Sequence, residues 1–200
     1  MNKFFQMAAL AAGLMAAATG SAAAMSDILH MPTLGQTSQP VGHYEFCKQY
    51  ASECQPNETR GAVKLTRAVW AAMVGVNNTA NTTIYPRTDE EIYGVPEVWA
   101  YPTTQGDCED FALLKQYMLE RQGLPRSALL ITVVRQPNGD GHAVLTVKTD
   151  KGDFILDNLE ERILAWTETE YHYLKRQSEQ DSSKWVGIAD DRNILVGSVR

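Results

Sequence analysis

Residues 106–112, with the sequence GDCEDFA, place one cysteine among three carboxylates at the predicted first turn of a helix. That turn favours a thiolate, because its free N–H groups and partial positive charge stabilise an anion. The flanking acids oppose ionisation of Cys108, since like charges raise the pKa of a thiol. These acids are Asp107, Glu109 and Asp110. Cys108 is therefore either an inert structural thiol or a nucleophile whose acidic surroundings are offset by something positive.

One predicted helix precedes this motif in the chain, and a second includes it. Apolar residues at helical spacing predict a first helix that begins near Asn57 or Thr59 and ends near Val76. The polar segment 77–83 follows, and we interpret its Asn-x-Thr triplets as loop residues. A second helix is predicted over 107–122, which places the cysteine at its N-terminus.

The pattern changes to that of strands after Pro125. Short runs rich in β-branched residues cover 128–135, 143–149 and 153–156. They are separated by two segments typical of hairpin turns, 137–141 and 150–152. These runs predict an antiparallel sheet built from hairpins.

The last part of the chain is less regular in pattern. Residues 160–180 are charged and are expected to be irregular or helical, whereas 185–188 and 194–196 are candidates for late strands. Helices followed by an antiparallel sheet predict an α+β fold. We find no internal repeat and expect one domain over residues 43–200.

The N-terminal residues predict export. Residues 1–24 have a basic start, an apolar run and small residues before a cleavage site near Ala24, as in a secretory signal. An uncleaved anchor is the alternative, although the apolar run is short for a membrane span. Residues 25–42 are polar, broken by prolines and glycines, and expected to form a flexible arm. The expected localisation is periplasmic or secreted.

The charge balance argues against nucleic acid as a partner. The chain has 18 Lys and Arg against 24 Asp and Glu, a formal net charge of -6. We find no basic stripe that could follow a phosphate backbone. An acidic chain suits cation binding, although many acidic proteins are simply soluble.

Three cysteines in an exported chain leave one unpaired. Cys47 and Cys54 lie close together in a polar segment and are the natural disulfide, which leaves Cys108 as a free thiol. Pairings that involve Cys108 remain open, because connectivity does not follow from sequence alone.

Two downstream residues offer a base and an orienting acid. His142 begins a predicted strand after a glycine-rich turn, where it could take the thiol proton and later protonate a leaving amine. Asp157 ends the next strand and could accept a hydrogen bond from the other ring nitrogen of His142. The alternatives are a structural histidine, a turn aspartate, or Asn158 in the orienting role.

The acids around the cysteine have two interpretations. Acids in a first helical turn cap N–H groups and offset the helix dipole, which accounts for one or two of them. Clustered carboxylates in an exported protein also suit Ca²⁺, whose charge would favour the thiolate. The chain has no EF-hand loop, so the sequence does not name further ligands.

Two segments carry a resemblance to a known family. GDCEDFALLKQYMLERQGLP at 106–125 and GHAVLTVKTDKGDFILDNLEERILAW at 141–166 resemble the bacterial transglutaminase-like cysteine peptidases, over roughly 44–188 in all. The resemblance implies a transglutaminase-like, papain-like fold.

The resemblance also implies roles for particular residues. In this family the positions of Cys108, His142 and Asp157 correspond to the nucleophile, the base and the orienting acid. In the LapG-type branch, the acids matching Asp107, Glu109 and Asp110 bind calcium. The resemblance therefore implies that these three acids form a calcium site.

The leading hypothesis is an exported cysteine peptidase. Cys108 would attack a peptide carbonyl to form a thioester acyl-enzyme, which water then hydrolyses. The LapG-type branch implies a surface adhesin as substrate and a membrane receptor as regulator. Acyl transfer to an amine is one alternative, and a non-catalytic module that binds metal or protein is another.

Overall fold

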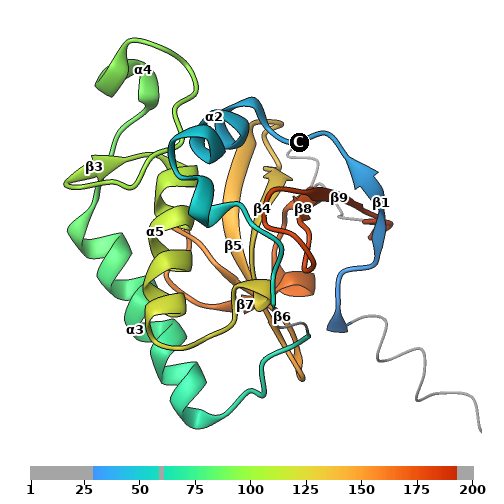
Figure 1. Ribbon diagram of the computed structural model, residues 1–200. Coiled ribbons are helices and arrows are strands. Elements are labelled where there is room, and N and C mark those ends of the chain that lie inside the picture. Colours follow the sequence, from blue (N-terminus) through green and yellow to red (C-terminus); the bar gives the residue numbers. More distant parts are fainter. Residues whose placement is uncertain (1–28, 59–60, 193–200) are drawn as a thin grey trace, which may run out of the picture.

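One antiparallel sheet forms the centre of the protein. The computed structural model describes residues 29–58 and 61–192, so the predicted signal segment 1–24 and the predicted strand 194–196 lie outside the described residues. The seven strands follow the order β1-β9-β8-β4-β5-β6-β7 (Figure 1). Their bounds are β1 Thr33–Thr37, β4 Leu129–Arg135, β5 Gly141–Thr149, β6 Gly152–Leu156, β7 Leu164–Ala165, β8 His172–Gln177 and β9 Trp185–Ile188.

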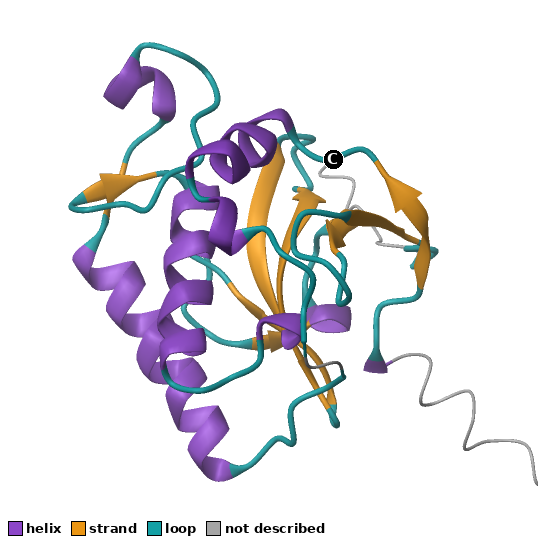
Figure 2. Ribbon diagram, in the orientation of Figure 1, coloured by secondary structure: helices purple, strands orange, loops and turns teal. Residues whose placement is uncertain are grey.

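Helices cover one side of this sheet, as the colouring in Figure 2 shows. Helix α5 packs on β4 and β5, and α3 packs against α5. The α-helices are α2 Val41–Gln49, α3 Arg67–Thr83, α4 Asp89–Tyr93 and α5 Cys108–Arg121. Short 3-10 turns are η1 Ala51–Glu53, η2 Arg126–Ala128 and η3 Trp166–Glu168, and β2 Tyr85–Pro86 pairs in parallel with β3 Gln105–Gly106.

The core lies between α5 and the sheet. Helix α5 buries Ala112, Leu113 and Leu119, while β5 buries Leu145 and Val147. Each buried leucine or valine side chain contributes roughly 1.5–3 kcal/mol through the hydrophobic effect. This burial fixes the first turn of α5 over the beginning of β5.

The two predicted hairpins are confirmed. Arg135 pairs with Gly141 across the β4–β5 turn, and Thr149 pairs with Gly152 across the β5–β6 turn. Gly152 has φ 127°, a conformation that L residues with a Cβ rarely adopt. Glycine at this position therefore allows the tight connection between β5 and β6.

The predicted bounds of the first helix are wrong. Helix α3 begins at Arg67, where the Thr66 hydroxyl accepts a hydrogen bond from Val69 N at 3.2 Å. It continues through 77–83, which we expected to be a loop. The polar residues of that segment form hydrogen bonds without leaving the helix: the Thr83 hydroxyl, for example, donates to the carbonyl of Thr79 at 2.7 Å.

Part of the predicted flexible arm is ordered structure. Residues 33–37 form β1, which pairs with β9 at the sheet edge, and α2 begins within the arm at Val41. Asp153 on β6 accepts a hydrogen bond from Met31 N at 3.0 Å. The order of residues 31–37 depends on pairing with residues more than 100 positions away, so local composition does not predict it.

Residues 160–180, expected to be irregular or helical, contain β7 and β8. The charge of Arg176 obscures the strand pattern of β8, although its side chain is buried. Asp153 and Glu179 accept from its guanidinium at 3.1 and 2.9 Å. Burial of a charge requires such partners. The late strand at 185–188 is confirmed as β9.

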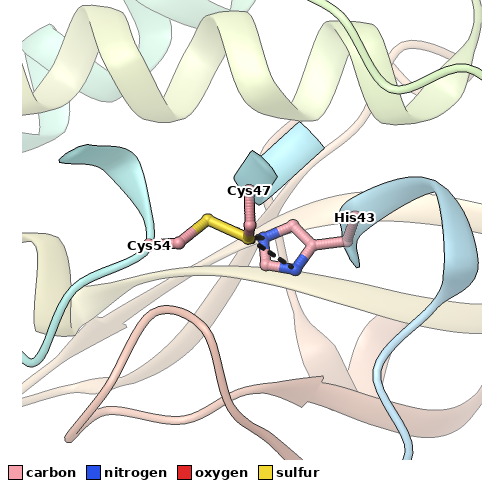
Figure 3. Close-up of side chains that lie close together, drawn as sticks. All are labelled: His43, Cys47 and Cys54. Carbon is pink, nitrogen blue, oxygen red and sulfur yellow. Dashed lines mark hydrogen bonds between the residues drawn. A yellow bond between two sulfur atoms is a disulfide. The ribbon is translucent and has the colours of Figure 1, made fainter. Parts of the chain in front are cut away.

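The predicted disulfide is present. Cys47 and Cys54 are bonded and connect α2 to η1. Figure 3 shows that the sulfur of Cys47 lies near both ring nitrogens of His43, at 3.7 and 3.8 Å. Because the two sulfurs are bonded to each other, they offer no thiolates to a metal ion.

His43 is a buried residue of this cluster. Trp185 Nε1 lies 3.1 Å from its Nδ1, and Gln177 Nε2 lies 3.0 Å from its Nε2. Burial, with a smaller contribution from the charge of Arg126, lowers the pKa of His43 to about 4. The ring is therefore neutral at physiological pH and connects α2 to the sheet.

No helix among residues 29–58 and 61–192 combines the length and the apolar character that crossing a bilayer requires.

His43 is expected to make stability depend on pH. Its pKa falls from 6.5 in the unfolded chain to about 4 in the fold, so the unfolded chain binds the proton first as pH drops. The free energy of unfolding should decrease by about 3 kcal/mol from this group between pH 6.5 and 4. Urea unfolding at several pH values measures this.

The matched comparison isolates the residue from other titrating groups. His43→Gln should be less stable at pH 7 but should lose this part of the pH dependence. His172→Gln, which alters a half-exposed histidine, should follow the wild type. Parallel curves for wild type and His43→Gln would contradict the assignment.

Candidate active site

Cys108 is the first residue of α5 and faces the beginning of β5. Its sulfur lies near the backbone N–H of Ala143, which follows His142 in the chain and acts on the pKa of the thiol. The thiol in turn donates to Glu109 Oε2 at 3.1 Å. It is the free cysteine among the described residues and is only partly exposed. The packing of α5 on β5 thus brings the predicted nucleophile beside the residue that follows the predicted base.

The surroundings of Cys108 favour the neutral thiol. Burial raises the pKa of Cys108 well above its ordinary value, and the charge and hydrogen bond of Glu109 raise it further. The N–H of Ala143 acts in the opposite direction but is outweighed. The acids and burial thus outweigh the helix N-terminus, and the Cys108 thiol is protonated when no other positive charge is present.

His142 and Asp157 are brought together by the β5–β6 hairpin. Leu145 pairs with Leu156, so the residue after β6 lies beside the start of β5. His142 Nε2 lies 2.8 Å from Asp157 Oδ1, and both residues are buried. Asn158, the alternative orienting residue, has its buried Oδ1 without a hydrogen-bond partner. Of the two candidates, the aspartate is therefore the one whose side chain contacts His142.

The Asp157 carboxylate is held in its ionised form. Burial alone would raise its pKa, but hydrogen bonds from His142, Leu159 N and the Tyr171 hydroxyl together keep the pKa below its ordinary value. An ionised carboxylate at this distance fixes the ring orientation of a histidine and stabilises its protonated form.

Three acids converge beside Cys108. Asp89, Asp107 and Glu109 each offer a carboxylate oxygen, and these atoms lie within 4.8 Å of one another. Asp89 Oδ1 and Asp107 Oδ1 are buried without a hydrogen-bond partner. Burial raises the pKa of Asp107, and it raises that of Asp89 to about 6 and that of Glu109 to about 9. The three carboxylates therefore do not all ionise readily without a positive charge nearby.

Asp89 was missed in the sequence analysis. It begins α4, which Thr88 caps, and a capped acidic turn is an ordinary helix start. The β2–β3 pairing, Pro86 with Gly106, brings it to Asp107, whose Oδ2 accepts from Asp89 N at 3.2 Å. A parallel pair of two residues leaves too little pattern to predict this contact.

Asp110, predicted as a ligand, lies outside this group of three. Its Oδ1 accepts a hydrogen bond from Ala100 N at 2.8 Å, and its Oδ2 is buried without a partner. Burial raises its pKa to about 8. Its side chain lies directly against Gly106, where a Cβ would come within 2.7 Å of Oδ2. Asp110 therefore supports the loop that leads into the cysteine.

Comparison with known proteins identifies relatives. The family described as bacterial transglutaminase-like cysteine proteinase BTLCP matches residues 33–193. Calcium-bound LapG from Legionella pneumophila is similar, with a TM-score of 0.51 and 25% identity over 62% of this chain and 71% of LapG. A further structure of the same LapG has a TM-score of 0.50 and 25% identity over 64% and 73% of the two chains. Comparison with curated proteins gave no match. The predicted α+β, transglutaminase-like fold is confirmed.

Gly106 is expected to tolerate no side chain. A Cβ there would meet the Asp110 side chain at 2.7 and 2.8 Å and Pro102 Cβ at 3.1 Å. Gly106→Ala should lower the free energy of unfolding by about 1–3 kcal/mol, as overpacking does. Urea unfolding measures the change.

Gly141→Ala is the matched control, because nothing lies within 4 Å of a Cβ at that position. It should change stability by less than about 0.5 kcal/mol. Equal effects of the two substitutions would show that the contact with Asp110 does not limit this position.

Proposed function

Since this chain belongs to the family of bacterial transglutaminase-like cysteine proteinases, we propose that it cleaves a peptide bond of a protein substrate through a triad of Cys108, His142 and Asp157. The chain is a cysteine peptidase by family, and its substrate is accordingly a protein. The hydrogen bond between His142 Nε2 and Asp157 Oδ1 at 2.8 Å is the observation that carries the triad.

The ring nitrogen that contacts Asp157 supports a choice of proton-transfer atoms. With Nε2 bonded to Asp157, Nδ1 of His142 is the nitrogen that takes the proton of the Cys108 thiol. The sulfur attacks the peptide carbonyl, and His142 then gives the proton to the leaving amine. Water, deprotonated by the same ring, hydrolyses the thioester. Free N–H groups at the start of α5 supply donors for the developing oxyanion.

We also propose a calcium site at the acidic cluster. The fit rests on the oxygen-only donor set of Asp89, Asp107 and Glu109 and on the orphaned buried oxygens of the first two. A similar protein, LapG of L. pneumophila, is described as calcium-bound. When bound, the ion supplies positive charge that offsets the acids and lowers the pKa of a nearby thiol. Asp110 then acts as a neighbour that shapes the site.

The proposed location is the periplasm or the outside of the cell. The predicted signal at residues 1–24 and the Cys47–Cys54 disulfide both suit an oxidising compartment. The proposed substrate is an exported surface protein of adhesin type, and the proposed regulator is a membrane receptor, both from the resemblance to LapG-type proteases.

Loss of the nucleophile or the base is expected to abolish cleavage. Cys108→Ala and His142→Ala should each reduce hydrolysis on the order of 10³-fold or more. New N-termini in surface proteins released from cells, quantified by mass spectrometry, measure the activity. His172→Ala, which alters a half-exposed histidine, is the control and should retain activity.

The same experiment distinguishes the reaction types. With a primary amine added, a peptidase releases free carboxyl ends, whereas an acyltransferase yields amide adducts of the amine. Undiminished cleavage by Cys108→Ala would overturn the triad.

Calcium is expected to stabilise the fold through the acidic cluster. Ligand at about 100 times its Kd raises the free energy of unfolding by about 2.7 kcal/mol. Thermal unfolding with calcium and with a chelator should show a higher Tm with calcium in the wild type. Asp89→Asn and Asp107→Asn should lose most of that shift.

Glu90→Gln is the matched control, since Glu90 is exposed on the same helix as Asp89. It should keep the full shift. An equal shift in all four proteins would place calcium elsewhere.

A further inference from the structure

A second side chain holds the Asp157 carboxylate. The Tyr171 hydroxyl donates to Asp157 Oδ2 at 2.6 Å, on the oxygen that His142 does not use. Oδ1 accepts from His142 and from Leu159 N, the latter at 3.0 Å. Each carboxylate oxygen therefore has its own partners, and the carboxylate has one favoured rotation about its bond to Cβ.

The main chain of Asp157 is held as well. Asn81 Nδ2, on α3, donates to the carbonyl of Asp157 at 2.8 Å. One turn earlier on the same helix, Asn77 Nδ2 donates to the carbonyl of Glu161 at 3.1 Å. Residues at i and i+4 lie on one helix face, so α3 holds both ends of the segment 157–161. With the backbone fixed, rotation of the carboxylate is the freedom that Tyr171 removes.

Tyr171 also lies beside the base itself. Its ring centroid is 5.5 Å from that of His142, with the rings tilted by 57°. Burial, and then the bond to Asp157, raise the pKa of Tyr171 above its ordinary value, so its hydroxyl stays a donor at neutral pH. The tyrosine thus contacts both members of the pair.

Other charged or titratable groups surround Asp157 without such a bond. Lys115 is buried on α5, where burial lowers its pKa to about 7 and the charge of Asp157 acts in the opposite direction. Tyr173 on β8 and Glu160 on the loop between β6 and β7 lie near enough to interact with Asp157 electrostatically. The hydroxyl of Tyr173 instead contacts the Thr169 hydroxyl at 2.9 Å. Of these two tyrosines, Tyr171 is thus the one that forms a hydrogen bond with the Asp157 carboxylate.

We propose that Tyr171 is a positioning residue of the peptidase: its donation to Oδ2 keeps Oδ1 directed at His142 Nε2, and so holds the ring with Nδ1 available to Cys108. The proposal rests on the proposed triad. Tyr171 does not touch the reacting atoms, and it acts through Asp157 on the tautomer and orientation of His142.

The test measures the tautomer of His142 and the reactivity of Cys108 separately. Nitrogen-15 NMR of the wild type, at a pH where the His142 ring is neutral, should show the ring protonated at Nε2 and not at Nδ1. In Tyr171→Phe the spectrum should change to a mixture of tautomers. The rate of alkylation of Cys108 by iodoacetamide, measured with calcium present, should fall about tenfold in the same variant.

Tyr173→Phe is the matched control, because it also removes one hydroxyl that makes one hydrogen bond. It should keep the wild-type tautomer and alkylation rate. Identical spectra and rates for Tyr171→Phe and the wild type would overturn the proposal.

A wild-type ring protonated at Nδ1 would also overturn the proposal, and that result needs no variant to fold. Failure of the triad itself is distinguishable, since it would show as cleavage that does not require Cys108 while the His142 tautomer is unaffected.

Discussion

The register of β5 between β4 and β6 is the constraint on which the site depends. His142 is paired with Val134, and Leu145 is paired with Leu156, so the base and the residue after β6 meet at one end of the hairpin. A shift of one residue would turn His142 to the opposite face of the sheet. The apolar residues of β5 that pack under α5 oppose that shift, because it would remove Leu145 and Val147 from this packing and place Thr146 there. The same packing holds Cys108 over Ala143.

Electrostatics at the site divide into a satisfied half and an unsatisfied half. Around Asp157 each oxygen accepts hydrogen bonds, and the charge is stabilised. Around Cys108 the carboxylates of Asp107 and Glu109 lie close together and have raised pKa values. Buried Oδ1 atoms of Asp89 and Asp107 have no hydrogen-bond partner. Natural folds pair most buried polar atoms, so unpaired buried oxygens in a cluster of carboxylates are typical of a place where a ligand completes the structure.

Local patterns predicted much of this arrangement, and the failures have a common cause. The hairpins, the disulfide and the helix over 107–122 follow from turn residues, cysteine spacing and apolar periodicity, which are local. The strand at 33–37 and the position of Asp89 depend on pairing with residues far along the chain, at β9 and β3. The polar helix over 77–83 was taken for a loop because its asparagines bond to a distant segment. Asp110 was grouped with its sequence neighbours as a ligand, and its Oδ1 accepts from Ala100 N, so its part in a metal site stays a prediction.

The attachment of α4 has a consequence for local stability. Asp89 lies in a segment joined to the rest of the protein by the two-residue β2–β3 pair and a few hydrogen bonds. Asp107 directly precedes α5 and Glu109 lies in its first turn, and this helix packs on the sheet. Opening of that segment would break little buried apolar surface, so its free energy lies far below that of global unfolding. Amide protons of α4 should therefore exchange through a subglobal opening that leaves the sheet closed. The acidic cluster can come apart and reassemble while the His142–Asp157 pair stays intact.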